Sequence, residues 1–583
     1  MGNIIFLVLI LVSYAGLYKL FEKAGLPAWK ALIPVYNFCV TSKLIDKPWW
    51  WGLIMIVPGV NLIMYGVYGF NLARAFGKRT TNDLLFASLL PYIFFVKIGF
   101  DKNAKFIGVK DIKTESALVK NWLDPIIFAV VAASIIRTFF FEAFTIPTSS
   151  LEKSLMVGDF LFVNKVCYGA KVPQTPISFP FAHHTLPFTQ STKSYLEWIK
   201  LPYFRLPGYS SPKNGEIVVF NYPDGDTVAV GCQDRSYYQL VRDYGYSNIH
   251  NPHFIVGNSE DSKPVGDIVA RPVDKREHYV KRCVAIAGDK FEIKDGEIYI
   301  NDQKQAMPEK AQHFYIVKTQ GMVFGTVDFD QNGQAYNPKM NFELLDKFDI
   351  NVPEAGIYNV RRDTMFYMLN MPADVANEVK AYPGVLSVTK MISPKGEFNK
   401  DIFPHSTRYP WNNDNYGPLV IPKAGATVQI DTGNICIYEK ILSTYDDGIH
   451  QITRNGAQVL YDGKPLTSYT FKQDYYWMMG DNRHNSADSR FWGFVPFDHV
   501  VGRPVFVWFS MKDPKNNPVS GSNLLGSLFK NSKEGKFRWE RFMCYVGEDG
   551  LVSWKIPVFA LIALIWAYSY WSKKRKAPAR QKK

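Results

Sequence analysis

The sequence alternates between uncharged apolar runs near its two ends and a long polar region between them. Pro48–Ala73 contains no charged residue, and Trp122–Phe141 and Val552–Trp571 are apolar apart from a few side chains. Because a helix needs about 20 apolar residues to cross a bilayer, these three runs are predicted membrane spans. Ile4–Tyr18 is an adequate fourth candidate and Leu84–Val96 a marginal fifth. We therefore expect a polar domain held between membrane helices.

Basic residues set the expected orientation of these helices. The formal net charge is +14, and the tail Lys573–Lys583 is rich in Lys and Arg and contains no acid. Asp101–Asn121 is also rich in lysine. Since basic loops stay on the cytoplasmic side, both segments are predicted to be cytoplasmic, with residues 148–551 on the outer face. If Leu84–Phe100 spans the membrane, the N-terminus lies outside, and otherwise it lies inside.

Composition and residue spacing exclude several classes of protein. A hydrophobic content of 47% with 21% charged residues excludes disorder. Half of the basic excess lies in the tail beside an apolar run, so nucleic-acid binding is not indicated. The six cysteines show neither CxxC nor metal-site spacing. His183-His184 and the pair His250 and His253 lie in proline-containing loops and are interpreted as loop histidines, so we expect no metal and no cofactor.

The polar region is predicted to be mostly β-structure with an insertion. Asp159–Lys165, Glu216–Tyr222 and Lys290–Asn301 are short apolar or alternating runs, and the last contains an Asp295-Gly296 hairpin turn. A helix near Asp374–Ala381 and a strand at Val385–Met391 are expected in the insertion. The predicted segments are an N-terminal membrane region (1–100), a basic linker (101–121), a membrane helix (122–147), a first catalytic part (148–301), an insertion or cap (302–455), a second catalytic part (456–550), a membrane helix (551–572) and a basic tail (573–583).

Three short blocks contain residues that could carry out chemistry. They are Ile146–Asp159, Tyr279–Asp289 with the sequence YVKRCVAIAGD, and Met479–Pro496 with the sequence MGDNRHNSADSRFWGFVP. Each block alone is typical of an ordinary turn, helix cap or lysine at the edge of an apolar strand. Only their combination in one chain favours a catalytic interpretation.

Together the blocks resemble the type I signal peptidases, membrane-bound Ser/Lys proteases that remove signal peptides from exported proteins. The resemblance covers Trp122–Asn301 and Gly456–Phe509. The first block departs from the family pattern Ser-Met-x-Pro-Thr-Leu, since this chain has Ser-Leu-Glu-Lys-Ser-Leu at 150–155, and His484 replaces a common acid. The resemblance implies a mostly β catalytic domain of the signal-peptidase type, anchored by several transmembrane helices. It also implies a multi-pass protein of the inner (cytoplasmic) membrane with its catalytic domain on the periplasmic side.

The same resemblance assigns roles to individual residues. Ser150 is the expected nucleophile, with Ser149 as the alternative, and Lys281 is the expected general base. Ser486 is expected to orient the lysine amine, and Thr148 to complete an oxyanion hole with the backbone N–H of Ser150. The supporting charges implied are Asp481, Asp488, Arg282 and Arg490, and the substrate pockets implied are formed by Phe144, Ile146, Leu151, Leu155 and Val280.

A Ser/Lys pair is chemically reasonable without reference to a family. A serine hydroxyl needs a nearby base to become nucleophilic. Lysine can be that base only when neutral, and its ordinary pKa of about 10.4 must be lowered by burial. Lys281 stands between Val280 and the apolar run Val284-Ala285-Ile286, which offers such an environment.

The expected partners are the signal peptides of preproteins, the lipid bilayer and the protein-export machinery. We expect cleavage after small residues at −1 and −3, with the substrate bound as an added strand. Two other interpretations remain open. The altered first block is compatible with a catalytically inactive, membrane-anchored binding or scaffold module. Residues 1–100 could instead form a transporter or channel, although these runs contain almost no ionisable residues to line a pathway.

Overall fold

The computed structural model divides the chain into two units. Unit 1 comprises residues 1–142, 169–208 and 225–277, and unit 2 comprises residues 143–168, 209–224 and 278–583. The structure describes residues 2–108, 124–189, 192–257, 262–330, 335–361, 363–446, 448–512, 537–547 and 551–576. Most of the predicted basic linker and the end of the basic tail therefore lie outside the described residues.

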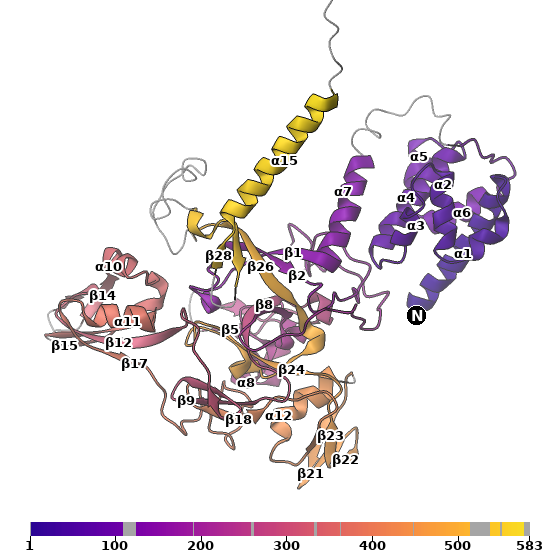
Figure 1. Ribbon diagram of the computed structural model, residues 1–583. Helices are drawn as coiled ribbons and strands as arrows, with labels where there is room; N and C mark the ends of the chain where they lie inside the picture. Colours follow the sequence, from indigo (N-terminus) through magenta and orange to yellow (C-terminus); the bar gives the residue numbers. More distant parts are fainter. Residues whose placement is uncertain are drawn as a thin grey trace, which may run out of the picture. The chain divides into compact units, whose positions relative to one another are not determined.

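Unit 1 contains the N-terminal helices, drawn from indigo to purple in Figure 1. An apolar core with aromatic residues at its centre holds them together, and Tyr68, fully buried, places its hydroxyl 2.7 Å from Ser42 Oγ. The helices are α1 (Gly2–Lys23), α2 (Tyr36–Leu44), α3 (Trp51–Ile54), α4 (Val60–Ala75), α5 (Thr81–Leu89), α6 (Pro91–Phe100) and α7 (Asp124–Ile135). The rest of unit 1 includes β4 (Thr227–Ala229), α8 (Tyr237–Tyr244), α9 (Tyr246–Ile249), β5 (Ile255–Val256), β6 (Lys263–Pro264) and β7 (Ile268–Ala270).

Length and hydropathy together decide which of the described helices could cross a membrane. No single described helix meets both requirements, whereas α5 and α6, bent by 120° at their junction, meet them together. The predicted multi-pass topology and its orientation stay predictions.

Unit 2 is built on one large antiparallel sheet, which agrees with the predicted mostly β domain. Its strand order is β1-β2-β26-β3-β8-β24-β25, and β27 and β28 extend from β26. Every residue of β3 and β24 is buried, as expected for central strands covered on both faces. The strands are β1 (Phe141–Thr145), β2 (Asp159–Asn164), β3 (Ile217–Asn221), β8 (His278–Ala285), β24 (Tyr475–Met479), β25 (Val495–Pro496), β26 (Val500–Ser510), β27 (Cys544–Val546) and β28 (Leu551–Ser553).

A second sheet of unit 2 contains the hairpin predicted from sequence. Its order is β11-β10-β9-β18, and Lys294 of β9 pairs with Glu297 of β10, so Asp295 and Gly296 form the turn. Their φ values of 51° and 76° are both positive, which confirms the predicted turn chemistry. The strands are β9 (Lys290–Lys294), β10 (Glu297–Ile300), β11 (Gln303–Lys304) and β18 (Tyr416–Val420).

The insertion contributes a third sheet with its own apolar core (salmon in Figure 1). The strand order is β15-β16-β12-β17, and the predicted helix and strand are confirmed as α11 (Ala373–Lys380) and β17 (Val385–Lys390). The other elements here are β12 (Gln312–Gln320), β13 (Gly325–Phe329), β14 (Ala335–Met340), α10 (Phe342–Lys347), β15 (Ala355–Arg361) and β16 (Thr364–Pro372).

The remaining elements of unit 2 follow β18 in the sequence, between β19 and the C-terminal helix α15. Arg541, which precedes β27, donates from Nε to Asp159 Oδ1 at 3.0 Å and from Nη2 to the carbonyl of Ser154 at 3.0 Å. The elements are β19 (Thr427–Gln429), α12 (Ile435–Lys440), β20 (Ile452–Asn455), β21 (Gln458–Tyr461), β22 (Lys464–Leu466), β23 (Ser468–Thr470), α13 (Ser489–Trp492) and α15 (Lys555–Lys576).

Candidate active site

The first block forms the loop between β1 and β2. Ser149–Leu151 makes a single 3-10 turn, in which Ser150 is 8% exposed. The loop closes where the N–H of Ile146 donates to Asp159 O and the N–H of Gly158 donates to Ile146 O, both at 2.9 Å. The first N–H groups of a helical turn have no acceptor within the turn. Backbone donors are therefore available beside the Ser150 hydroxyl.

Lys281 lies on β8, in the interior of the large sheet. It pairs in register with Val218 of β3 and is 4% exposed. Its Nζ lies 2.5 Å from Ser150 Oγ. A separation of this size is within the reach that proton transfer between a hydroxyl and a base requires.

Burial changes the chemistry of the Lys281 amine. It lowers the pKa of Lys281 to about 8, although Asp488 and Asp481 act to raise it. Arg490 lowers the pKa further. With a pKa of about 8, about a tenth of the amine is neutral at pH 7, against a negligible fraction for an exposed lysine.

The third block packs directly against the Ile146–Asp159 loop, which we name the nucleophile loop after the predicted role of Ser150. The N–H of Asn482 donates to Ser150 O at 3.1 Å, and Asn482 Nδ2 donates to Ser149 O at 3.1 Å. A Cβ on Gly480 would lie 2.5 Å from Ser150 O and 2.3 Å from Ser486 Oγ. Only glycine fits at position 480 without displacing the loop or the Ser486 hydroxyl.

Two buried ion pairs hold the third block in place. Arg282 donates through Nε and Nη2 to Asp481 at 2.8 Å and 2.7 Å, and Arg490 donates to Asp488 at 2.9 Å and 2.7 Å. Burial alone would raise the pKa of both carboxyl groups, but the paired guanidinium groups hold each pKa below its usual value. Ser154 Oγ also donates to Asp481, at 2.6 Å. Asp481 is thus charged and tied to the strand that carries Lys281 and to the loop that carries Ser150, whereas the pair of Asp488 and Arg490 lies within the third block.

Comparison with known proteins identifies the family of the chain. Residues 119–368 and 409–509 match the family described as signal peptidase, peptidase S26. The chain belongs to the signal peptidase family. Residues 29–109 match a second family, described only as a family of unknown function.

Curated relatives extend over much of the chain at low identity. Signal peptidase I of Helicobacter pylori strain 26695 is 22% identical over 456 residues, which cover 75% of this chain and 96% of the relative. Signal peptidase I of Haemophilus influenzae is 22% identical over 417 residues, covering 71% of this chain and 73% of the relative. A shorter stretch of 56 residues is 43% identical to signal peptidase I of Aquifex aeolicus, covering 10% of this chain and 22% of the relative.

Two of the residues predicted for this site, Thr148 and Ser486, make no hydrogen bond with Ser150 or Lys281 among the described residues. Thr148 is exposed in an extended conformation, with φ −131° and ψ 153°, and its side chain does not cap the turn that follows it. Within the described part of the chain, the buried Oγ of Ser486 has no hydrogen-bond partner, Lys281 included. The oxyanion role of Thr148 and the orienting role of Ser486 stay predictions.

The predicted pocket residues lie together in one apolar cluster beside the loop. Ile146, Leu151 and Leu155 are buried there, and Phe144 and Val280 pack against them. Phe144 and Val280 are half-buried, so they form the part of this cluster nearest to solvent. The structure brings the five side chains together, and their role in binding substrate stays a prediction.

Sequence reasoning missed three polar residues that bear on the nucleophile loop. Asn482 and Asn485 lie within the third block, and Asn482 directly follows the turn-forming pair Gly480-Asp481, which is a local signal for a polar turn. Glu354 lies in the insertion and contacts both asparagines, through Oε1, at 2.9 Å and 2.7 Å. Nothing in the local sequence around Glu354 indicates this contact.

No metal centre is found near these residues. In the ranges that the structure describes, no group of three or more His, Cys, Asp or Glu side chains is arranged to hold a metal ion.

Proposed function

We propose that the chain is a membrane-bound serine endopeptidase that removes signal peptides from exported proteins by a Ser150–Lys281 dyad. The observation that carries this proposal is the 2.5 Å separation between Lys281 Nζ and Ser150 Oγ, with the lysine 4% exposed. Membership of the signal peptidase family supports the reaction class.

In the proposed reaction Ser150 Oγ attacks the scissile carbonyl carbon while its proton moves to neutral Lys281 Nζ. The resulting oxyanion is stabilised by the Ser150 backbone N–H and the Thr148 hydroxyl. Removing one such donor typically raises the activation free energy by about 3–4 kcal/mol. The Lys281 ammonium then returns its proton to the leaving amine, which gives an acyl-enzyme on Ser150. Lys281 next deprotonates a water molecule, which hydrolyses the ester and frees the serine.

The remaining predicted residues have supporting roles in this proposal. Ser486 orients the amine, and the ion pairs of Arg282 and Arg490 fix the strand and the third block. The pocket residues Phe144, Ile146, Leu151, Leu155 and Val280 accept small side chains at −1 and −3 of the substrate. The catalytic domain is placed on the outer face of the cytoplasmic membrane, where signal peptides emerge from the bilayer beside the export machinery.

Cleavage of a preprotein with an Ala-x-Ala site by the purified full chain tests the proposal. Ser150→Ala and Lys281→Ala should each lower kcat by at least about 10³-fold, because no other nucleophile or base replaces them. Ser149→Ala should still cleave, which separates the two candidate nucleophiles. Wild-type rates in either dyad variant would exclude the dyad, and a folded wild-type chain that binds but never cuts the preprotein would favour the scaffold interpretation.

A further inference from the structure

The insertion reaches the nucleophile loop and the third block through polar contacts. Lys153, in the loop, forms an ion pair of 2.7 Å with Asp349 of the insertion. The N–H of Gln312, the first residue of β12, donates to Asp481 O at 2.8 Å, and the N–H of Arg483 donates to Gln312 O at 2.9 Å. The insertion is thus bonded to both segments that surround Ser150.

His484, which replaces an acid common in the family, makes another polar contact between the third block and the insertion. The N–H of Phe314 in β12 donates to His484 Nδ1 at 3.1 Å. Because Nδ1 accepts, the proton of the neutral ring lies on Nε2, which donates to Asp414 Oδ1 at 2.8 Å. The histidine therefore connects the third block to two points of the insertion, Phe314 and Asp414.

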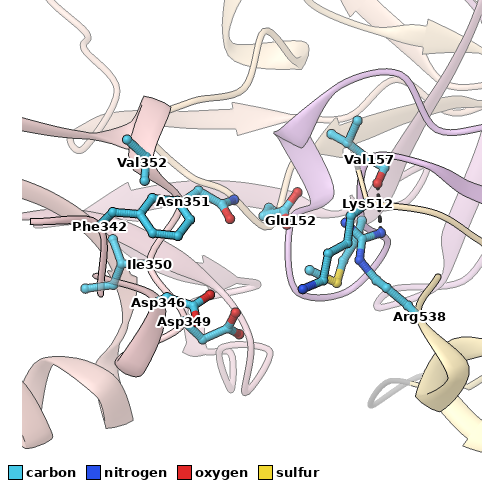
Figure 2. A pocket seen from close by; sticks show the side chains of 11 residues that line it. Glu152, Val157, Phe342, Asp346, Asp349, Ile350, Asn351, Val352, Lys512 and Arg538 are labelled. Atoms are coloured by element: carbon cyan, nitrogen blue, oxygen red, sulfur yellow. Dashed lines mark hydrogen bonds between the residues drawn. The ribbon is translucent and has the colours of Figure 1, made fainter. Parts of the chain in front are cut away.

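A polar pocket separates the insertion from the loop next to these links. Its volume is about 100 Å³. Figure 2 shows Glu152 and Val157 of the loop on one side, and Phe342, Asp346 and Asn351 of the insertion on the other. Beside this space the ion pair of Lys153 and Asp349 joins the two segments.

Glu354 of the insertion accepts hydrogen bonds from two asparagines of the third block. It ends the short 3-10 turn Val352–Glu354, just before β15, and is buried. Its Oε1 accepts from Asn482 Nδ2 at 2.9 Å and from Asn485 Nδ2 at 2.7 Å. Its Oε2 accepts from Asn370 Nδ2 at 3.1 Å.

Both asparagines also donate hydrogen bonds to the nucleophile loop. Asn482 Nδ2 also donates to Ser149 O, and Asn482 Oδ1 accepts from Asn370 Nδ2 at 2.7 Å, so both ends of its amide are fixed. Asn485 Nδ2 donates to Ser149 Oγ at 3.2 Å. Each asparagine thus donates one hydrogen bond to Ser149, the residue immediately before Ser150.

We propose that Glu354 is a positioning residue, which fixes Asn482 and Asn485 so that they hold the Ser149–Ser150 peptide for attack. This inference rests on the proposed function and extends it to the insertion, which becomes part of the active site. In a reaction that depends on near-attack geometry, a loop displaced by about 1 Å can lose about 100-fold in rate.

The surroundings of Glu354 are unfavourable for a residue that serves stability alone. Among the described residues, no Lys or Arg lies within ion-pair distance of its carboxylate, which is held only by amide groups. A buried charge without an opposite charge is costly. Glutamine, the neutral residue of the same shape, offers only one acceptor oxygen, so the two carboxylate oxygens are explained by the three amide groups that donate to them.

Kinetics of the full chain on a preprotein test the inference. Glu354→Ala should lower kcat about 10- to 100-fold with KM changed less than about threefold, because the substrate pockets are not touched. Glu354→Gln retains an Oε1 acceptor for both asparagines and should recover most of the rate. The pH dependence of kcat should keep its midpoint in both variants, since Asp488, Asp481 and Arg490 are the charges that act on Lys281.

Tyr367→Phe is the matched control within the insertion. Tyr367 is fully buried and donates to Gly325 O at 2.8 Å, so its loss weakens the insertion without touching either asparagine. Glu354→Ala should be much slower than this control at a similar thermal midpoint. Equal rates would overturn the inference, as would a Glu354→Gln variant as slow as Glu354→Ala.

Two further outcomes separate this inference from the proposed function. If Glu354→Ala does not fold, Glu354→Asp, whose carboxylate is one methylene further from the asparagines, should show the same loss of kcat, and a wild-type rate for it would overturn the inference. A Ser150→Ala variant that still cuts would overturn the proposed function itself. A normal kcat for folded Glu354→Ala, with Ser150→Ala inactive, would overturn the positioning role alone.

Discussion

Arg282 and Asp481 form a buried, two-bonded ion pair although 199 positions separate them in the chain. Arg282 follows Lys281 on β8, and Asp481 lies in the third block, next to the asparagine that binds the nucleophile loop. Strand β24, which leads into that block, also pairs with β8, where Met479 lies opposite Arg282. The ion pair therefore fixes the position of Lys281 relative to the loop that carries Ser150.

Breaking this pair should destabilise unit 2. Arg282→Met leaves the Asp481 carboxylate buried without its partner, which typically costs about 3–5 kcal/mol. The double variant Arg282→Met, Asp481→Asn should recover much of that loss, because no unpaired charge remains. Chemical unfolding monitored by tryptophan fluorescence measures the free energy of unfolding of the single and the double variant. A single variant as stable as the wild type would show that the pair contributes little, and Lys290→Met, which breaks an exposed pair with Asp302, is the control.

Activity should rise with pH through the pKa of the lysine. The pKa of Lys281 is lowered to about 8, and the reaction requires the neutral amine. We therefore expect kcat/KM to increase tenfold per pH unit well below pH 8 and to level off above it. Initial rates between about pH 5.5 and about pH 10 measure this increase. A midpoint near 10.4, the ordinary lysine value, would contradict the burial that the mechanism requires.

Gly480→Ala should inactivate the enzyme more than its small size suggests. The added Cβ would lie 2.5 Å from Ser150 O, so the loop must move and its hydrogen bond from Asn482 N–H must lengthen. We expect a loss of kcat of about 100-fold. Gly356→Ala is the control, because a Cβ there meets nothing within 4 Å. If both variants were equally active, the close approach at Gly480 would not matter for catalysis.

Ser486→Ala separates a catalytic role from a structural one. The Ser486 hydroxyl is buried without a hydrogen-bond partner in the described residues, so removing it should leave the thermal midpoint unchanged or raise it. The proposed orientation of the Lys281 amine requires in addition that kcat falls. Thermal unfolding and kcat measured on the same preparation decide this. An unchanged kcat would remove Ser486 from the mechanism.

Local sequence signals were sufficient for elements whose conformation depends on neighbouring residues. The Asp295-Gly296 turn is an example, because positive φ values at two successive residues are a local property of Asp and Gly. The strand at Val385–Lys390 and the helix at Ala373–Lys380 followed from apolar spacing in the same way. The contacts of Glu354 with Asn482 and Asn485 could not be predicted, since these partners are 128 and 131 positions away and no sequence pattern connects them.

The sequence by itself determined the reaction class, because the residue types in the three blocks and their order along the chain are enough to identify the family. It also placed Ser150 and Lys281 as the reacting groups of the proposal. Only the tertiary structure decided how far the amine is removed from water, which residues hold the loop, and that the insertion contacts the loop and the third block. These properties depend on contacts between strands and loops far apart in the chain, and burial exists only once those segments have packed together.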